Sequence, residues 1–396
     1  MMMAAAAASA TAGCKIADPV ESTAAVGVPD VLVARTKDGL AVIREGKLNS
    51  LGAGAASLSG SVLCVAKGGS VSLISTLSGV SMGEWQLKGD WTPRTVTTAG
   101  SLVALTAPGT DANNPAPRES TTIVFANAAG ELYRHKLTGI VEPDAFTADG
   151  TGLFVLEWLP ASAPDHYRVR HLTIATGKLS PLFTRNKVPV PPGSEEEMRG
   201  EGRIGIPSPD RKVLYTLYTH QPGHQHTRNL LSGRPNRDVH AFVHTLHLEQ
   251  GWAYCVDLPA PFGSADAGAY TSTLSGNGGW LYVADLAAGK LAIVSTYDLT
   301  VNRVVDIPPL AGGSPYAIGA GDRIFIGSGK QVSVLDSDGS LVTSWSLDRP
   351  LRGLAASNDQ GRVYLGAEGG ISWRDVTGAG SGQAALPGLL SVVRAV

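Results

Sequence analysis

The chain has 396 residues and a formal net charge of −2, which excludes the global basic field through which proteins attract nucleic acid. No apolar run approaches the ~20 residues that a membrane-spanning helix needs. The 48 glycines and 24 prolines indicate many tight turns, and charged residues, at 17%, are fewer than the ~25% of typical soluble domains.

The chain begins with a small-residue, apolar stretch, MMMAAAAASATAGC, that stops at Cys14. Small residues of this kind precede the cleavage site of secretory segments. The tetrapeptide TAGC resembles the lipobox of bacterial lipoproteins, although Thr11 stands where leucine is usual and no Lys or Arg precedes the apolar run. The resemblance implies lipidation of Cys14, an extracytoplasmic, membrane-anchored or secreted bacterial protein, and a signal segment with linker at 1–28 before a domain at 29–396. The alternative is an alanine-rich tail with an incidental cysteine.

One short pattern recurs along the rest of the chain. Its clearest copy has a polar turn at 277–279 followed by apolar strands at 280–284, 291–295 and 301–307. Alternating apolar residues bounded by closely spaced turns are typical of an antiparallel meander. The second strand of each unit is the easiest to recognise, and it recurs at 31–33, 62–64, 102–104, 153–155, 214–216, 281–283, 324–326 and 363–365.

Meanders in series, without the long connection of a Greek key, predict an all-β protein that folds as a β-propeller. The count favours eight blades, with seven as the alternative. The unit at 31–51 lacks an innermost strand, which the apolar run at 389–393 can supply. We therefore expect the N- and C-terminal strands to pair and close the ring, which removes open sheet edges. Cys64 and Cys255 fall four units apart and are expected to be separate buried thiols.

Two segments carry a family resemblance. SPDRKVLYTLY and SGNGGWLYVADLAAGKLAIVSTYDLTVNRVVDI resemble the YVTN-type, WD40-like repeats of bacterial surface and periplasmic propellers, in which a turn precedes "LYV" and a third strand follows. The resemblance is good over about 205–350 and implies a propeller in an extracytoplasmic setting. It implies no activity, because such propellers include binding proteins, lactonases and cofactor dehydrogenases.

Units three to five are enlarged. With strands labelled A to D from the centre to the rim, the extra residues at 107–120, 159–168 and 220–239 lie between strands B and C. A further insertion at 185–203 connects strand D of unit four to strand A of unit five. These connections should all open on one face, and long loops on one face of a repeat scaffold usually form its binding surface. Neutral drift is the alternative, since loop closure entropy grows slowly with length.

Histidines gather in the enlarged part of unit five. The spacings His224-x-His226 and His220-x-x-x-His224 can place two imidazoles on one ion, as zinc or copper sites need. His240 and His244 are expected on one face of the next strand because strand side chains alternate. These residues are the candidate metal ligands, and no other cofactor is expected. The alternative is a set of solvated or hydrogen-bonded histidines, because neither HExxH nor paired CxxC motifs occur.

Charged residues in the same loops are candidates for ligand binding. Arginine pairs bidentately with carboxylate or phosphate groups, and an acidic run attracts cations or basic partners. The alternative is a solvated loop held together by its own charges. The candidates are Asp165, His166, Glu195, Glu196, Glu197, Arg228, Arg234, Arg237 and Asp238.

Three functions remain open at this point. The leading one is a monomeric, lipid-anchored propeller that binds a protein or glycan partner at the cell surface through the enlarged face. The second is a metal-dependent hydrolase or lactonase, or a redox enzyme, with histidines at the channel mouth. The third is a structural envelope protein. No nucleophile elbow, Walker A loop or dinucleotide fingerprint lies between a strand and a helix, so a non-enzymatic role is favoured and no catalytic residue is assigned.

Overall fold

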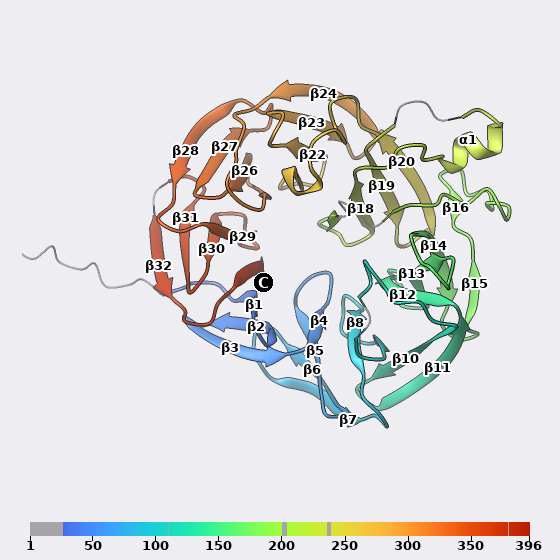
Figure 1. Cartoon of the computed structure of the whole chain (residues 1–396). Helices are drawn as coiled ribbons and strands as arrows, with labels where there is room; N and C mark the ends of the chain where they lie inside the picture. Colours follow the sequence, from blue (N-terminus) through green and yellow to red (C-terminus); the bar gives the residue numbers. More distant parts are fainter. Residues whose placement is uncertain (1–26, 110, 200–203, 236–238, 379) are drawn as a thin grey trace, which may run out of the picture.

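The computed structural model describes residues 27–396 except 110, 200–203, 236–238 and 379. These residues form a ring of eight β-sheets arranged about a central axis (Figure 1). The predicted eight-bladed β-propeller is therefore confirmed, and the seven-bladed alternative is wrong. Within the described part of the chain, no helix is long and apolar enough to cross a membrane.

Each blade is a four-stranded antiparallel meander whose strand A lies nearest the axis and whose strand D lies at the rim. Blades 1 to 4, each from A to D, are β33 (Ser391–Ala395), β1 (Leu32–Thr36), β2 (Gly39–Arg44), β3 (Lys47–Gly52); β4 (Gly54–Ala56), β5 (Val62–Lys67), β6 (Ser70–Ser75), β7 (Ser81–Gln86); β8 (Thr92–Val96), β9 (Val103–Thr106), β10 (Ser120–Asn127), β11 (Gly130–Thr138); and β12 (Ile140–Phe146), β13 (Gly152–Leu159), β14 (His166–Thr173), β15 (Lys178–Ser180). Blades 5 to 8 are β17 (Ile204–Pro207), β18 (Val213–Tyr218), β19 (Phe242–His247), β20 (Trp252–Asp257); β21 (Tyr270–Leu274), β22 (Trp280–Asp285), β23 (Lys290–Ser295), β24 (Thr300–Asp306); β25 (Tyr316–Ala320), β26 (Arg323–Ser328), β27 (Gln331–Asp336), β28 (Leu341–Ser346); and β29 (Leu351–Ala356), β30 (Arg362–Ala367), β31 (Gly370–Asp375), β32 (Ser381–Ala385).

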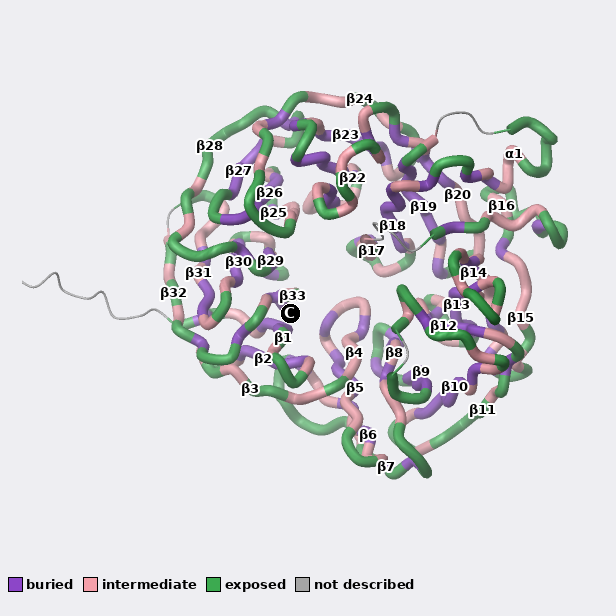
Figure 2. Tube along the Cα trace, in the orientation of Figure 1, coloured by how far each residue is buried: buried purple, intermediate pink, exposed green. Residues whose placement is uncertain are grey.

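The core of the protein lies between neighbouring blades. Middle strands are buried while rim strands such as β24 and β28 are largely exposed (Figure 2). Because strand side chains alternate between faces, Leu214 and Tyr218 of β18 pack toward blade 4, whereas Tyr215 and Leu217 pack toward blade 6. Each second strand thus contributes to two interfaces, which explains why it is the most apolar strand of its unit and the one that the sequence reveals best.

A recurrent turn joins strands A and B. The hydroxyl of a Ser or Thr accepts a hydrogen bond from the backbone N–H five residues later, where strand B begins. In blade 5 the pair is Ser208 and Val213 (3.0 Å), and in blade 6 it is Ser275 and Trp280 (3.0 Å). The polar turns predicted ahead of each second strand serve this purpose, because short hydroxyl side chains readily satisfy local backbone donors.

The ring closes as the sequence predicted. The last strand, β33, pairs antiparallel with the first, β1, with Leu32 opposite Ala395. Asp30 strengthens the closure by accepting hydrogen bonds from Arg362 (2.7 Å) and from the hydroxyl of Tyr364 in blade 8. Residues from the two ends of the chain therefore share one sheet and one buried interface.

The backbone of β33 lies so close to blade 8 that a side chain has no room at Gly353. Its φ is +126°, and an added Cβ would lie 2.1 Å from the carbonyl oxygen of Val392. We expect Gly353→Ala to destabilise the protein by about 1–3 kcal/mol, as overpacking does, and to lower the thermal unfolding midpoint. Gly268→Ala is the control, because nothing lies within 4 Å of its added Cβ. Equal midpoints for the two variants would contradict this explanation.

Candidate functional site

The four enlarged connections of blades 3 to 5 contact one another. The N–H of Arg118 bonds to the carbonyl of Ala161, which joins the B–C loops of blades 3 and 4 (3.3 Å). Arg199, in the connection between blades 4 and 5, pairs with Asp165 of the blade 4 loop (3.3 Å). The backbone N–H of Arg199 also bonds to Gln221 in the B–C loop of blade 5 (3.0 Å). The predicted gathering of these insertions is therefore present in the structure.

The connection from blade 4 to blade 5 follows the rim and then turns inward. Its strand β16 (Phe183–Thr184) adds to blade 5 as a fifth strand, parallel to β20. Further along, Met198 exchanges two backbone hydrogen bonds with Tyr167 of β14, both 2.8 Å long. These two attachments hold the intervening residues, including Glu195, Glu196 and Glu197, against blades 4 and 5.

Helix α1 (Thr227–Ser232) lies in the B–C loop of blade 5, at the outer side of the ring beside β20 (Figure 1). His226 occupies the N-cap position without a side-chain capping hydrogen bond, and Gly233 ends the helix in the left-handed conformation, with a φ of 65°. His224 and His226 directly precede the helix, so the fold directs both imidazoles toward the blade rather than into solvent.

Four side chains converge beneath these loops. The potential metal-binding atoms of Glu196, His224, His226 and Cys255 all lie within 4.8 Å of one another. Nε2 of His224 is 3.1 Å from Nδ1 of His226, and the Sγ of Cys255 is 2.9 Å from Oε2 of Glu196. The two imidazoles lie 3.8 Å and 3.7 Å from the Glu196 carboxylate. We call these four residues the donor cluster.

A second layer of contacts orients the two imidazoles. Nδ1 of His224 is 3.1 Å from the carbonyl oxygen of Glu197, which can only accept, so Nδ1 carries the proton and Nε2 a lone pair. Nε2 of His226 is 2.5 Å from Asp257, which leaves its Nδ1 directed into the cluster. Arg228 holds Asp257 in turn, at 2.7 Å. Histidine ligands of metals usually have such a carbonyl or carboxylate on the other ring nitrogen.

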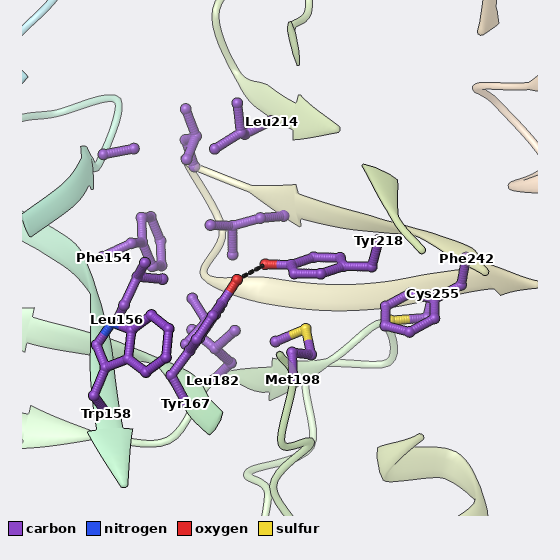
Figure 3. Packing of buried hydrophobic residues seen from close by; sticks show 14 of the residues in the cluster. Phe154, Leu156, Trp158, Tyr167, Leu182, Met198, Leu214, Tyr218, Phe242 and Cys255 are labelled. Atoms are coloured by element: carbon purple, nitrogen blue, oxygen red, sulfur yellow. Dashed lines mark hydrogen bonds between the residues drawn. The ribbon is translucent and has the colours of Figure 1, made fainter. Parts of the chain in front are cut away.

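The donor cluster borders the apolar core between blades 4 and 5. His226 is fully buried, Cys255 is 1% exposed, and Glu196 is half-buried. Phe242 stacks on the ring of His224, with centroids 4.3 Å apart, and meets His226 edge-on at 5.1 Å. Figure 3 shows Cys255 beside Phe242, with Met198 nearby in the same apolar packing. Because few water molecules can reach these donors, a bound cation would interact with them strongly.

The surroundings shift the pKa values of three cluster residues, Glu196, His226 and Cys255. Burial alone would raise the pKa of Glu196, but interactions with His224 and His226 outweigh it and hold that pKa well below its usual value. Burial opposes a charged His226, yet Asp257 and Glu196 raise its pKa overall. Burial raises the pKa of the Cys255 thiol well above its usual value, and the nearby Glu196 carboxylate adds to this effect. The Cys255 thiol therefore stays protonated and donates a hydrogen bond to the Glu196 carboxylate. A bound cation would take the place of that proton.

The spacing of the donors fits a tetrahedral zinc ion. Bonds of about 2.0–2.1 Å to nitrogen and about 2.3 Å to sulfur put the atoms of a tetrahedral set about 3.3–3.7 Å apart. Four donor-to-donor separations are 2.9, 3.1, 3.7 and 3.8 Å, and all the donor atoms lie within 4.8 Å of one another. Two imidazoles, a thiolate and a carboxylate together suit Zn²⁺ better than Cu⁺, which prefers all-sulfur or nitrogen–sulfur sets.

The structure separates the other histidine candidates from this cluster. His240 was expected on the same strand face as His244, but it lies in the loop before β19 and is exposed, so that expectation is wrong. His220 is directed elsewhere, with Nδ1 2.9 Å from the hydroxyl of Thr219 and its ring 6.3 Å from that of Tyr270. His244 is buried on β19, opposite Cys255 of β20, and borders the cluster.

Most of the charged candidates lie in or near the donor cluster, where they form ion pairs. His166 bonds to Asp165 at 2.6 Å and lies 3.4 Å from the Glu197 carboxylate. Glu195 pairs with Arg168 and Arg170, both at 3.2 Å. These interactions support the alternative in which charges hold the loops in place.

The remaining charged candidates are less informative. Arg234 is exposed, and its backbone N–H bonds to the carbonyl of Asn229 in α1. Arg237, Asp238 and the lipidation candidate Cys14 lie outside the described residues.

Sequence reasoning missed two members of the site. Cys255 was expected to be buried without a role, and Asp257 was not singled out. Neither residue belongs to a metal-binding sequence motif. Both lie on the outer strand of blade 5, the blade that contains the histidines. The alignment of His244 with Cys255 across two neighbouring strands was the available signal.

Comparison with known proteins shows the fold of this chain but neither its family nor its function. No protein-family model and no curated protein sequence matches the chain. Among solved structures, it resembles apo AztD from Citrobacter koseri, with a TM-score of 0.54 and 14% identity over 92% of this chain and 97% of that one. It also resembles Saccharomyces cerevisiae Sqt1, with a TM-score of 0.50 and 10% identity over 84% of each chain. BamB from Moraxella catarrhalis matches with a TM-score of 0.43 and 12% identity over 87% of this chain and 97% of that one. At these identities the likeness to AztD and Sqt1 shows the fold alone, and the YVTN and lipoprotein resemblances stay expectations.

Proposed function

We propose that this protein is a β-propeller that binds one Zn²⁺ ion under the enlarged loops of blades 4 and 5. The observation that carries the proposal is the convergence of Glu196, His224, His226 and Cys255 within 4.8 Å. These residues come from the connection before blade 5, from its B–C loop and from its outer strand. Loops that appear as separate insertions in the sequence thus have one shared role.

A metal held by four protein donors is suited to being retained rather than to catalysis. Catalytic zinc sites leave one coordination position for water or substrate, whereas structural sites use four protein ligands. The donor cluster supplies four, and two of its side chains, His226 and Cys255, are almost inaccessible to solvent. A binding role therefore has better support than the hydrolase, lactonase or redox alternatives.

The direct test is metal stoichiometry of the purified full chain. After treatment with a chelator and addition of Zn²⁺, elemental analysis should find about one ion per chain, since the cluster offers one four-donor site. Replacing Zn²⁺ with Co²⁺ should produce the near-ultraviolet charge-transfer band of a thiolate ligand, and Cys255→Ser should remove it. Absence of bound metal, or a band that Cys255→Ser does not change, would refute the proposal.

We place this protein outside the cytoplasm, anchored by lipid at Cys14, on the strength of the lipobox-like residues 11–14. Expressed in a bacterium supplied with radiolabelled palmitate, the full chain should incorporate label and fractionate with membranes. Cys14→Ser should abolish both properties while leaving Zn²⁺ binding unchanged. A labelled Cys14→Ser variant, or an unlabelled parent chain, would contradict the anchor without affecting the metal site.

A further inference from the structure

A second feature of blade 5 is a cavity of about 400 Å³ on its outer side. The cavity is enclosed by β14, the connection containing β16, helix α1 and β20. Much of its wall is apolar, contributed by Leu182, Val190, Met198, Leu231 and Tyr254. Its size falls within the range of about 300–1,000 Å³ typical of small-molecule sites, which combine apolar walls with a few polar groups.

The polar groups of this cavity favour an anion. The guanidinium groups of Arg185 and Arg228 both lie over the ring of Tyr254, at 5.5 Å and 5.2 Å from its centroid. Arg228 is neutralised by Asp257, whereas the hydrogen bonds of Arg185 go to the uncharged carbonyls of Tyr297 and Asp298. A bound anion would pair with the Arg185 guanidinium, which stacks on the Tyr254 ring at the wall of the cavity.

The carboxylates in the wall do not cancel this preference. Glu195 is paired with Arg168 and Arg170 of β14. Glu196 accepts the backbone N–H of Thr227 at 2.8 Å and belongs to the donor cluster. Both negative charges are thus already balanced by protein groups, and the positive charge of Arg185 remains available to an incoming ligand.

We propose that this cavity binds a small anionic amphiphile, such as a medium-chain carboxylate. The apolar chain would pack against Leu182, Val190 and Met198, and the carboxylate would pair with Arg185, whose planar guanidinium matches a carboxylate bidentately. This cavity adjoins the donor cluster, because Glu196 and Cys255 line its wall, so decanoate binding is measured both with and without Zn²⁺.

The test uses isothermal titration of the full chain with decanoate and, as a charge-reversed probe, decyltrimethylammonium. Decanoate should bind at least about 10-fold more tightly than the cationic probe, because the positive charge of Arg185 favours the anion. Leu231→Asp puts a negative charge into the cavity wall and should weaken decanoate binding by at least about 10-fold. Leu230→Asp is the matched control, since its side chain lines a different cavity and should change binding less than about twofold.

Both leucines are exposed, at 46% for Leu231 and 36% for Leu230, so neither substitution removes a core residue. Arg185→Gln, also on the surface, provides an independent variant that should weaken decanoate binding without weakening binding of the cationic probe. The proposal is overturned if decanoate does not bind, if both probes bind equally, or if Leu231→Asp and Leu230→Asp have equal effects. Zn²⁺ affinity measured on the same samples keeps these outcomes distinct from a failure of the metal site.

Discussion

A chain with His226→Ala is expected to bind Zn²⁺ at least about 100-fold more weakly than the unaltered protein. His226 supplies one of the four donors, and removing a group that only orients a ligand already costs about 10–100-fold in affinity. Affinity is measured by competition with a coloured chelator. Because a bound ligand stabilises the folded state, the rise in unfolding temperature that Zn²⁺ causes should also shrink.

Two further variants make the result specific. Asp257→Asn weakens the contact that orients His226 and should reduce Zn²⁺ affinity by about 10–100-fold. His240→Ala removes an exposed histidine from the same loop and should leave affinity unchanged. If His226→Ala and His240→Ala bind Zn²⁺ equally well, the cluster is a hydrogen-bonded structural group and not a metal site.

The second large effect is expected at the closure of the ring. Val392 of β33 is 4% exposed and packs with Leu32, Ala355 and Tyr364 between blades 1 and 8. Val392→Asp loses this apolar contact and buries a carboxylate without a partner, which together should lower the free energy of unfolding by about 4 kcal/mol or more. Urea denaturation followed by tryptophan fluorescence measures the change.

The neighbouring residue provides the control. Val393 lies at the β-bulge of the same strand and is 43% exposed, so Val393→Asp should change stability by less than about 0.5 kcal/mol. The two variants add the same charge to β33 and differ in whether the substituted side chain is buried or exposed. Similar denaturation midpoints would show that β33 is not needed to close the propeller.

The fold could be predicted from the sequence because its signals are local and repeated. The second strand of each unit packs on both neighbouring blades, so residues such as Leu281, Tyr282 and Val283 form a continuous apolar run. Turn residues before it, such as Ser275 and Asn277, are needed to bond the backbone of the turn. Closure by β33 followed from counting strands, since the first unit was one strand short.

The site could be predicted only in part, because its residues meet through tertiary structure. The spacing of His224 and His226 was visible, and Glu196 stood out within an acidic run. Cys255 is 59 residues from Glu196 along the chain, and nothing local distinguishes it from any buried cysteine. Its role depends on the path of the connection from blade 4, which no periodicity describes.

The misplaced histidine has a similar cause. His240 was assigned to a strand because it precedes His244 by four residues, but β19 begins only at Phe242. The backbone carbonyl of His240 bonds instead to the N–H of Gln221, which closes the base of the long loop. Strand boundaries next to long insertions depend on such tertiary contacts and are poorly determined by pattern alone.

The position of β33 has a consequence for the synthesis of this protein. A ribosome releases β1, β2 and β3 early, but the strand that completes their sheet emerges last. Throughout translation of the seven later blades, the inner edge of β1 has no native partner, and such edges are where nascent chains associate wrongly. The protein is therefore most vulnerable to aggregation and proteolysis until residues 391–395 dock, and slower elongation would prolong that interval.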